Sequence, residues 1–237
     1  MATISIIQTK PASTPFKLLN LTFIVFRNFL DIMPLKDLHT LSKQNDTVKT
    51  MSRFRGEVVR CLEIQTGVIT DDVDYTSYSH LINRPYKTTP FEVLRVLMDA
   101  SIDPDVLLSK LNEKCYTELD LHGEYNWKHV VTFLHEGVKF IELNDTMNLP
   151  QTDMKEFFKI LTEFKIQEIF FFPKNRDADW AEAALKSWSS VIGTDLEPWE
   201  YDAQIGAMAL KIPIGNRVMK VYYDDSDEGD VDMYYDN

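Results

Sequence analysis

The residues of this chain that could do chemistry are its five histidines, its two cysteines and its adjacent acidic residues. His129 and His135 lie six positions apart in one expected helix, whereas two helical histidines that share a metal ion lie about four positions apart. Cys61 and Cys115 lack the paired spacing of a zinc or redox site. We therefore expect histidines without a metal ion, free thiols, and a reducing compartment, cytoplasmic or nuclear.

Adjacent carboxylates occur at Asp71–Asp72 and at Asp224–Asp225, in polar stretches where such groups stay solvated and keep their ordinary acidity. The second pair opens a segment similar to a calcium loop, but its twelfth position is Tyr235 instead of the bidentate Glu that such a loop needs. No glycine-rich phosphate loop follows an expected strand. The sequence predicts no catalytic residue, no cofactor and no metal site, so we expect a protein that is not an enzyme.

Length and charge define the broad class of the protein. A chain of 237 residues, 44% of them hydrophobic, is long enough to bury a real core. The net charge of -12 argues against nucleic acid or an anionic membrane surface as the partner, because both are bound by clustered Lys and Arg. These totals favour a folded protein that binds other proteins.

An apolar run near the start raises the question of a membrane segment. Polar and charged residues such as Lys17 and Arg27 interrupt this run between Phe16 and Leu30, and a span needs roughly 20 mostly apolar residues. Residues 1–14 lack the basic start and unbroken apolar middle of a signal peptide. We expect these first residues to form a flexible arm, with no membrane contact.

Residues 15–56 have the pattern of three short helices. Apolar residues recur at steps of three and four between Leu21 and Met33, which is the period of a helix with one broad buried face. Pro34 suits the first turn of a second helix, and Asn45 or the residue after it can cap a third, which ends before Gly56. So small a bundle is marginal by itself and is expected to pack against something.

Residues 57–223 alternate between strand and helix patterns, which predicts parallel pairing in one α/β domain. The central strand residues Leu119, Ile141 and Ile169 lie 22 and 28 positions apart, close to the period of leucine-rich repeats, so we describe the domain as irregular and repeat-like. The expected strands are 57–64, 117–122, 139–143 and 167–172, the expected helices are 88–102, 126–137, 152–164 and 178–193, and 66–83 is an expected loop.

The chain then closes with a β-hairpin of two strands, 205–212 and 217–223, joined by a Gly-Asn turn. Residues 224–237 are rich in Asp and Glu and contain no Lys or Arg. This composition predicts an acidic tail outside the folded domain.

Three consecutive aromatic residues, Phe170, Phe171 and Phe172, occupy one expected strand. Neighbouring side chains in a strand point to opposite faces of the sheet, so both faces must carry aromatic rings. Helices on both faces would explain this, and a partner surface on one face is the alternative. We favour helices on both faces.

The first helices resemble the F-box of the large nematode family of F-box proteins. The matching residues are "PFKLLNLTFIVFRNFLDIMPLKDLHTLSKQNDTVKTM", with a Pro-Phe-x-Leu-Leu-x-Leu lead, an aromatic first helix and then Leu-x-x-Leu-Ser-Lys. The strand and α/β units that follow resemble the substrate-binding region of the same family. Two positions differ from the family pattern: Thr22 stands where a Pro is usual, and Asn45, Asp46 and Thr47 replace a basic cluster.

The resemblance implies a substrate-recognition adaptor without chemistry of its own. F-box helices bind the Skp linker of a cullin-RING ubiquitin ligase, and the C-terminal domain presents a target protein, here unknown, for ubiquitin transfer. Because apolar stripes on helices usually pack inward, each matching residue can belong to the core of the module or to its partner interface. The matching positions are Pro15, Leu18, Leu19, Leu21, Phe23, Phe26, Pro34, Leu35, Leu38 and Leu41.

Two other functions stay open at this point. The differences at Thr22 and at the missing basic cluster allow a protein-binding α/β repeat domain that no longer engages a ubiquitin ligase. The α/β alternation alone also allows a hydrolase or transferase, because such folds host many unrelated functions.

Overall fold

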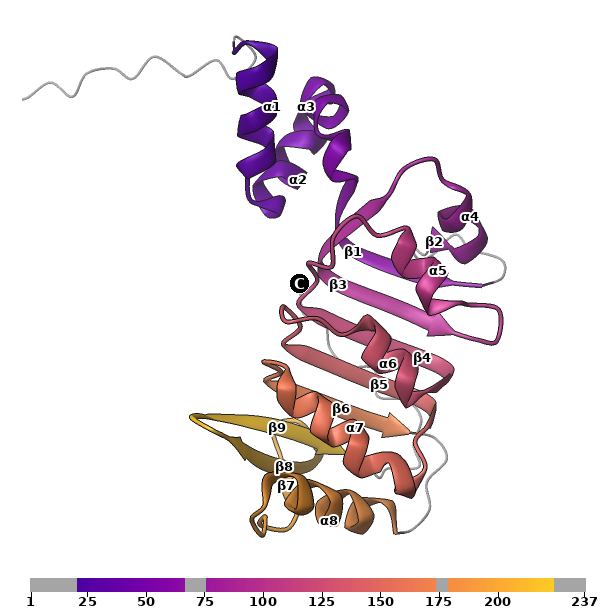
Figure 1. Ribbon diagram of the computed structural model, residues 1–237, viewed down its shortest axis with the longest axis vertical. Coiled ribbons are helices and arrows are strands. Elements are labelled where there is room, and N and C mark those ends of the chain that lie inside the picture. Colours follow the sequence, from indigo (N-terminus) through magenta and orange to yellow (C-terminus); the bar gives the residue numbers. More distant parts are fainter. Residues whose placement is uncertain (1–20, 67–75, 174–178, 224–237) are drawn as a thin grey trace, which may run out of the picture.

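The computed structural model of the chain describes residues 21–66, 76–173 and 179–223. A small helical module lies at one end of an extended sheet domain, and the strands of the domain follow one another away from the module (Figure 1). The predicted arm 1–14 and the predicted acidic tail 224–237 lie outside the described residues.

The helical module contains three α-helices, as the sequence predicts. They are α1 (Phe23–Ile32), α2 (Leu35–Gln44) and α3 (Asp46–Met51), followed by the 3-10 turn η2 (Arg53–Arg55). The Asn45 side chain caps α3 by accepting hydrogen bonds from the backbone N–H groups of Thr47 and Val48, at 2.9 and 3.1 Å. Pro34 is the residue just before α2. The module has a core of its own, made by Phe26, Leu30, Met33, Leu38 and Val48.

The module is fixed to two strands of the sheet domain by polar contacts. The His39 ring nitrogen Nδ1 lies 2.8 Å from the carbonyl oxygen of Val58, and the Thr89 hydroxyl donates a hydrogen bond to the Arg55 carbonyl at 2.7 Å. Gly56 turns the chain between the two parts with a φ of 77°, and a Cβ there would lie 2.7 Å from a backbone oxygen of Lys87. This position therefore requires glycine. The module thus leans on the sheet domain, as its small size predicts.

One sheet of nine strands forms the second part of the molecule, in the order β2-β1-β3-β4-β5-β6-β9-β8-β7. Strands β1 to β6 and β9 pair in parallel with their neighbours, whereas β8 pairs antiparallel with β9 and with β7. The parallel pairing and the closing hairpin are both predicted correctly. The strands are β1 (Glu57–Gln65), β2 (Thr76–Ser77), β3 (Thr88–Met98), β4 (Glu118–Asn126), β5 (Phe140–Asn148), β6 (Glu168–Pro173), β7 (Glu200–Asp202), β8 (Ala207–Ile214) and β9 (Arg217–Tyr223).

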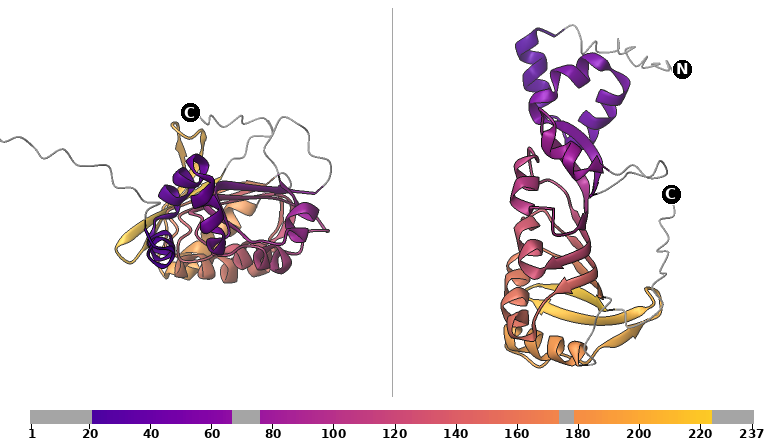
Figure 2. Two further views of the ribbon diagram at one scale, coloured as in Figure 1. Left: turned by 90° about the horizontal axis from the view of Figure 1, so that it is seen from above. Right: turned by 90° about the vertical axis from the view of Figure 1, so that its right-hand side faces the viewer.

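Helices of the described chain cover one face of this sheet and leave the other without helices (Figure 2). Under the helices, Leu94, Leu119, Ile141 and Ile169 form a row of register neighbours, and all are buried. Burial of this row and of the aromatic residues above it is the main source of stability. The helices are α4 (Tyr78–Asn83), α5 (Pro104–Ser109), α6 (Trp127–Phe133), α7 (Gln151–Glu163) and α8 (Trp180–Ile192).

The predicted helix 88–102 is wrong, because Thr88–Met98 is the strand β3. Local signals of a helix start, Thr89 followed by Pro90, mislead here. The segment instead alternates, with Leu94 and Val96 buried under the helices and Arg95 on the opposite face. It pairs with β1 on one side and β4 on the other, and Pro90 lies where the β1–β3 register is irregular, which is where a sheet tolerates a missing N–H.

The expected loop 66–83 and the expected aromatic layer also need correction. Tyr78–Asn83 is the helix α4, while residues 67–75 lie outside the described part of the chain. Phe171 is fully buried under the helices, and Phe170 and Phe172 project from the other face, where they are half-buried. The preferred explanation of two helical layers is therefore wrong for the described chain, whose second sheet face carries aromatic rings without helices over them.

Candidate partner-binding and sheet-surface sites

Helix α1 exposes large apolar side chains on the surface of the module. The exposed fractions are 61% for Phe23, 69% for Ile24, 50% for Val25 and 79% for Ile32. We name these four residues the α1 outer face. The helix packs inward through the buried Phe26 and Leu30, and the exposed Arg27, Asn28 and Asp31 form a polar strip beside Ile24. Four large apolar side chains exposed on one short helix make the α1 outer face a candidate docking surface.

The matching F-box positions divide between the surface and the interior of the module. Phe26 and Leu38 are buried, so charged substitutions there act first on folding. The other described positions reach the surface at least in part: Phe23 and Pro34 are exposed, and Leu21, Leu35 and Leu41 are half-buried. Pro15, Leu18 and Leu19 lie outside the described residues.

Sequence reasoning missed Ile24 and Ile32, although Val25 was part of the expected apolar stripe. The sequence contains a signal for them, because Ile24 and Ile32 do not lie at the steps of three and four residues that connect the buried positions of the helix. An apolar residue that breaks the buried stripe of a helix marks exposed surface. The same logic could have identified the α1 outer face from the sequence.

The second candidate is a row of charged residues on the sheet face without helices, which we name the open face. Glu63, Arg95, Asp120 and Glu142 are register neighbours on β1, β3, β4 and β5. The Arg95 guanidinium donates to a Glu63 carboxylate oxygen at 2.8 Å and, through Nε, to Asp120 Oδ2. Asp120 is only 1% exposed, so its charge depends on such partners.

His122, two residues beyond Asp120 on β4, extends the charged row. Its Nε2 atom lies 2.8 Å from Asp120 Oδ1. Burial by itself would lower the pKa of His122, but the hydrogen bond to Asp120 and the charge of that carboxylate outweigh burial, so the pKa is raised. Burial and the nearby charge of Asp120 also raise the pKa of Glu142. The site therefore holds protons more firmly than exposed His and Glu side chains do.

Aromatic rings continue the same row toward the end of the sheet. Phe170 pairs in register with Glu142 and with Tyr222. Its ring stacks on that of Tyr222 with centroids 4.6 Å apart, and on that of Phe172 at 6.0 Å. The open face thus joins a carboxylate-rich half to an aromatic half, in which Phe170 and Phe172 reach the surface in part while Tyr222 is only 1% exposed. The partly exposed rings suit contact with another protein.

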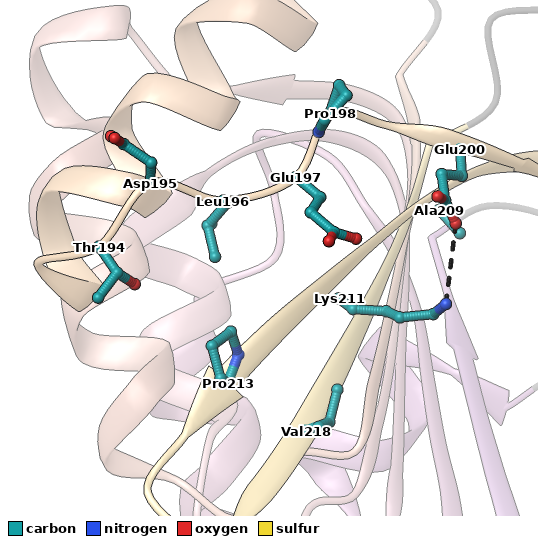
Figure 3. A pocket seen from close by; sticks show the side chains of 10 residues that line it. All are labelled: Thr194, Asp195, Leu196, Glu197, Pro198, Glu200, Ala209, Lys211, Pro213 and Val218. Carbon is teal, nitrogen blue, oxygen red and sulfur yellow. Dashed lines mark ion pairs between the residues drawn. The ribbon is translucent and has the colours of Figure 1, made fainter.

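A shallow groove lies between the segment 194–200 and the hairpin of β8 and β9, with a volume of ≈ 290 Å³ (Figure 3). Its charged groups are acidic except for Lys211, whose ammonium lies 3.8 Å from a carboxylate oxygen of Glu200. The residues that line this groove include neither His nor Cys, so it offers no pair of nucleophile and base.

Neither cysteine has the properties of a nucleophile. Burial, followed by the charge of Glu63, raises the pKa of Cys61 to about 12, and burial followed by a hydrogen bond with Glu113 raises the pKa of Cys115 to about 11. Both residues are free thiols and half-buried, as expected for cysteines without a catalytic role. Reactive cysteines have lowered, not raised, pKa values.

The raised pKa values of both thiols predict slow alkylation of the folded protein. At pH 8, iodoacetamide should modify Cys61 and Cys115 at least about tenfold more slowly in the native chain than in urea, because little thiolate is present. Peptide mass spectrometry gives the two rates separately, and Cys61 should be the slower. Alkylation of the native chain at the unfolded rate would contradict the predicted thiol environment.

Comparison with protein-family models, with curated proteins and with solved structures found no match. Among the described residues, none of the helices combines the length and the apolar character that crossing a bilayer requires.

Proposed function

We propose that the chain is a substrate-recognition adaptor of a Skp/cullin/F-box ubiquitin ligase. The observation that carries this proposal is the α1 outer face, a large apolar surface on a small helical module at the end of a separate domain. Apolar helix faces of this kind dock against partner proteins. In this proposal the module is an F-box, and it docks on a Skp-type linker protein.

The sheet domain would hold the target protein. Its strands and helices alternate along the chain as in leucine-rich repeats, and its open face presents both charged and aromatic side chains without helices over them. Such an adaptor works in the cytoplasm or nucleus by binding two proteins at once. In this proposal the adaptor carries out no catalysis of its own.

Calorimetry with a purified Skp-type linker protein tests the proposal. The full chain should bind the linker, and Ile32→Asp should weaken the affinity at least about tenfold, because a charge buried in an apolar interface is costly. Ile24→Asp is the second variant. Val218→Asp is the matched control, because Val218 is also an exposed apolar residue, 57% accessible, but lies on the distant β9.

Two results would contradict the adaptor role. One is the absence of linker binding by a folded chain, and the other is equal binding by Ile24→Asp, Ile32→Asp and the wild type. Circular dichroism establishes that each variant is folded.

The alternative is a protein-binding domain that no longer engages a ligase. It is favoured by Thr22, which starts α1 without a side-chain capping hydrogen bond, and by Asn45, which caps α3 at a position where the family carries basic residues. In that case the folded chain would show no affinity for any Skp-type linker, while substitutions on the open face would still change the capture of its target.

A further inference from the structure

Two carboxylate oxygens and one imidazole nitrogen on the open face converge on one point. The side-chain nitrogen Nδ2 of Asn144 lies 2.9 Å from Glu142 Oε1, 3.3 Å from Asp120 Oδ1 and 3.3 Å from His122 Nε2. One ligand atom of each of the three residues lies within 4.8 Å of the other two. They come from two adjacent strands, β4 and β5, whose register brings Asp120 beside Glu142.

The groups around the Asn144 amide are all of kinds that bind metal ions. Without an ion, His122 Nε2 donates to Asp120 Oδ1 at 2.8 Å, and the two amide hydrogens of Asn144 are directed at the Glu142 and Asp120 oxygens. Two carboxylate oxygens and an imidazole nitrogen around one point are the donor set of a metal centre. Bonds of about 2.0–2.2 Å to one ion place neighbouring ligand atoms roughly 3 Å apart, close to the separation of this His–Asp pair.

The groups behind the two β4 ligands hold them in this orientation. The second oxygen of Asp120, Oδ2, accepts a hydrogen bond from Arg95, which leaves Oδ1 directed at the site. On the other side of the His122 ring, Nδ1 lies 3.8 Å from Asp145 Oδ2. The same Asp145 oxygen accepts the Gly123 N–H at 2.9 Å. At 3.8 Å this carboxylate is a charged neighbour of the ring and not a hydrogen-bond partner, and a carboxylate on this side of a histidine is common around metal ligands.

We propose that Asp120, His122 and Glu142 form a binding site for a divalent transition-metal ion of the Zn²⁺ class. Asn144 can supply a fourth ligand by turning its amide so that the oxygen, not the nitrogen, faces the ion. The imidazole favours Zn²⁺ and similar ions over Ca²⁺ and Mg²⁺, which take oxygen ligands. His122 is one-third exposed, which gives the ion a path from solvent. The ion would bridge β4 and β5 on the open face.

This inference departs from the expectation of no metal site. That expectation considered histidines along one helix and acids adjacent in sequence, whereas these ligands come from two strands and meet only through the sheet register. It goes beyond the proposed function and does not depend on it, because its test contains no linker protein.

Titration calorimetry of the metal-free full chain with ZnCl₂ tests the site. Both cysteines are replaced by Ser in every sample, so that thiols cannot bind the ion. One Zn²⁺ per chain should bind, and His122→Ala and Glu142→Gln should each weaken that binding at least about tenfold, as loss of metal-site groups commonly does. Zn²⁺ should also raise the melting temperature of the chain that keeps the three ligands, since the ion binds the folded state.

Two matched control variants show whether Zn²⁺ binds at this site or to acidic side chains in general. His129→Ala removes a histidine outside the site, and Glu63→Gln removes a carboxylate of the same row on the far side of Arg95. Both should bind Zn²⁺ like the parent chain. Zn²⁺ binding that is absent from the folded parent, or unchanged in both His122→Ala and Glu142→Gln, would overturn the inference. Because Glu142→Gln conserves shape, it keeps the test decisive if His122→Ala fails to fold.

Discussion

Replacing Leu38 with Asp is expected to unfold the helical module and to leave the sheet domain folded. Leu38 is fully buried in a core of only five buried residues. Loss of a buried Leu side chain costs about 2–5 kcal/mol, and an unpaired buried carboxylate adds to that cost. A core of this size is too small to stay folded after such a loss of free energy. Hydrogen exchange should become fast over residues 23–51 while residues 88–98 stay protected.

Ile32→Asp is the matched control for this prediction. It introduces the same charge into the same module, at a residue that is 79% exposed. Exchange over residues 23–51 should then stay at the wild-type rate. Protected helices in Leu38→Asp would mean that the module core is not organised as described.

Replacing Trp188 with Ala should destabilise the sheet domain more than most single substitutions would. Trp188 is fully buried on α8, and its ring stacks on that of Phe158 with centroids 4.3 Å apart. Truncation of a buried Trp to Ala typically costs about 3–5 kcal/mol, because it removes apolar contact and leaves a cavity. Urea unfolding followed by circular dichroism should show a free energy of unfolding lowered by that amount, with the midpoint at a lower urea concentration.

Trp188→Phe separates packing from hydrogen bonding at this position. Within the described part of the chain, the buried Nε1–H of Trp188 has no acceptor, so its loss removes an unsatisfied donor. The Phe ring can keep the stack on Phe158, and the cost should be well below that of Trp188→Ala. Equal costs for the two variants would show that ring stacking is not what stabilises this site.

The sequence predicts well those features that are determined locally or by regular spacing. Asn45 caps α3 because its short side chain reaches the N–H groups of the first turn, and Gly215 permits the positive φ of the hairpin turn. Leu119, Ile141 and Ile169 become register neighbours, as their spacing indicates. Local geometry and periodicity can be read directly from the residues.

Features that depend on which particular segments pair as strands, and on the side chains that their register brings together, were not predicted. Thr88–Met98 carries a local helix-start signal, but hydrogen bonding to strands on both sides outweighs that signal. The charged row from Glu63 to Glu142 is assembled from four strands, so it exists only once their register is known. The candidate metal ligands were missed for the same reason.

Hydrogen exchange of the full chain with and without a Skp-type linker protein tests most directly whether the α1 outer face is a docking surface. The account predicts that the linker slows exchange within residues 23–32, the span of α1, and leaves the exchange of β9 unchanged. Linker binding without added protection of α1, or with protection confined to the sheet domain, would contradict it.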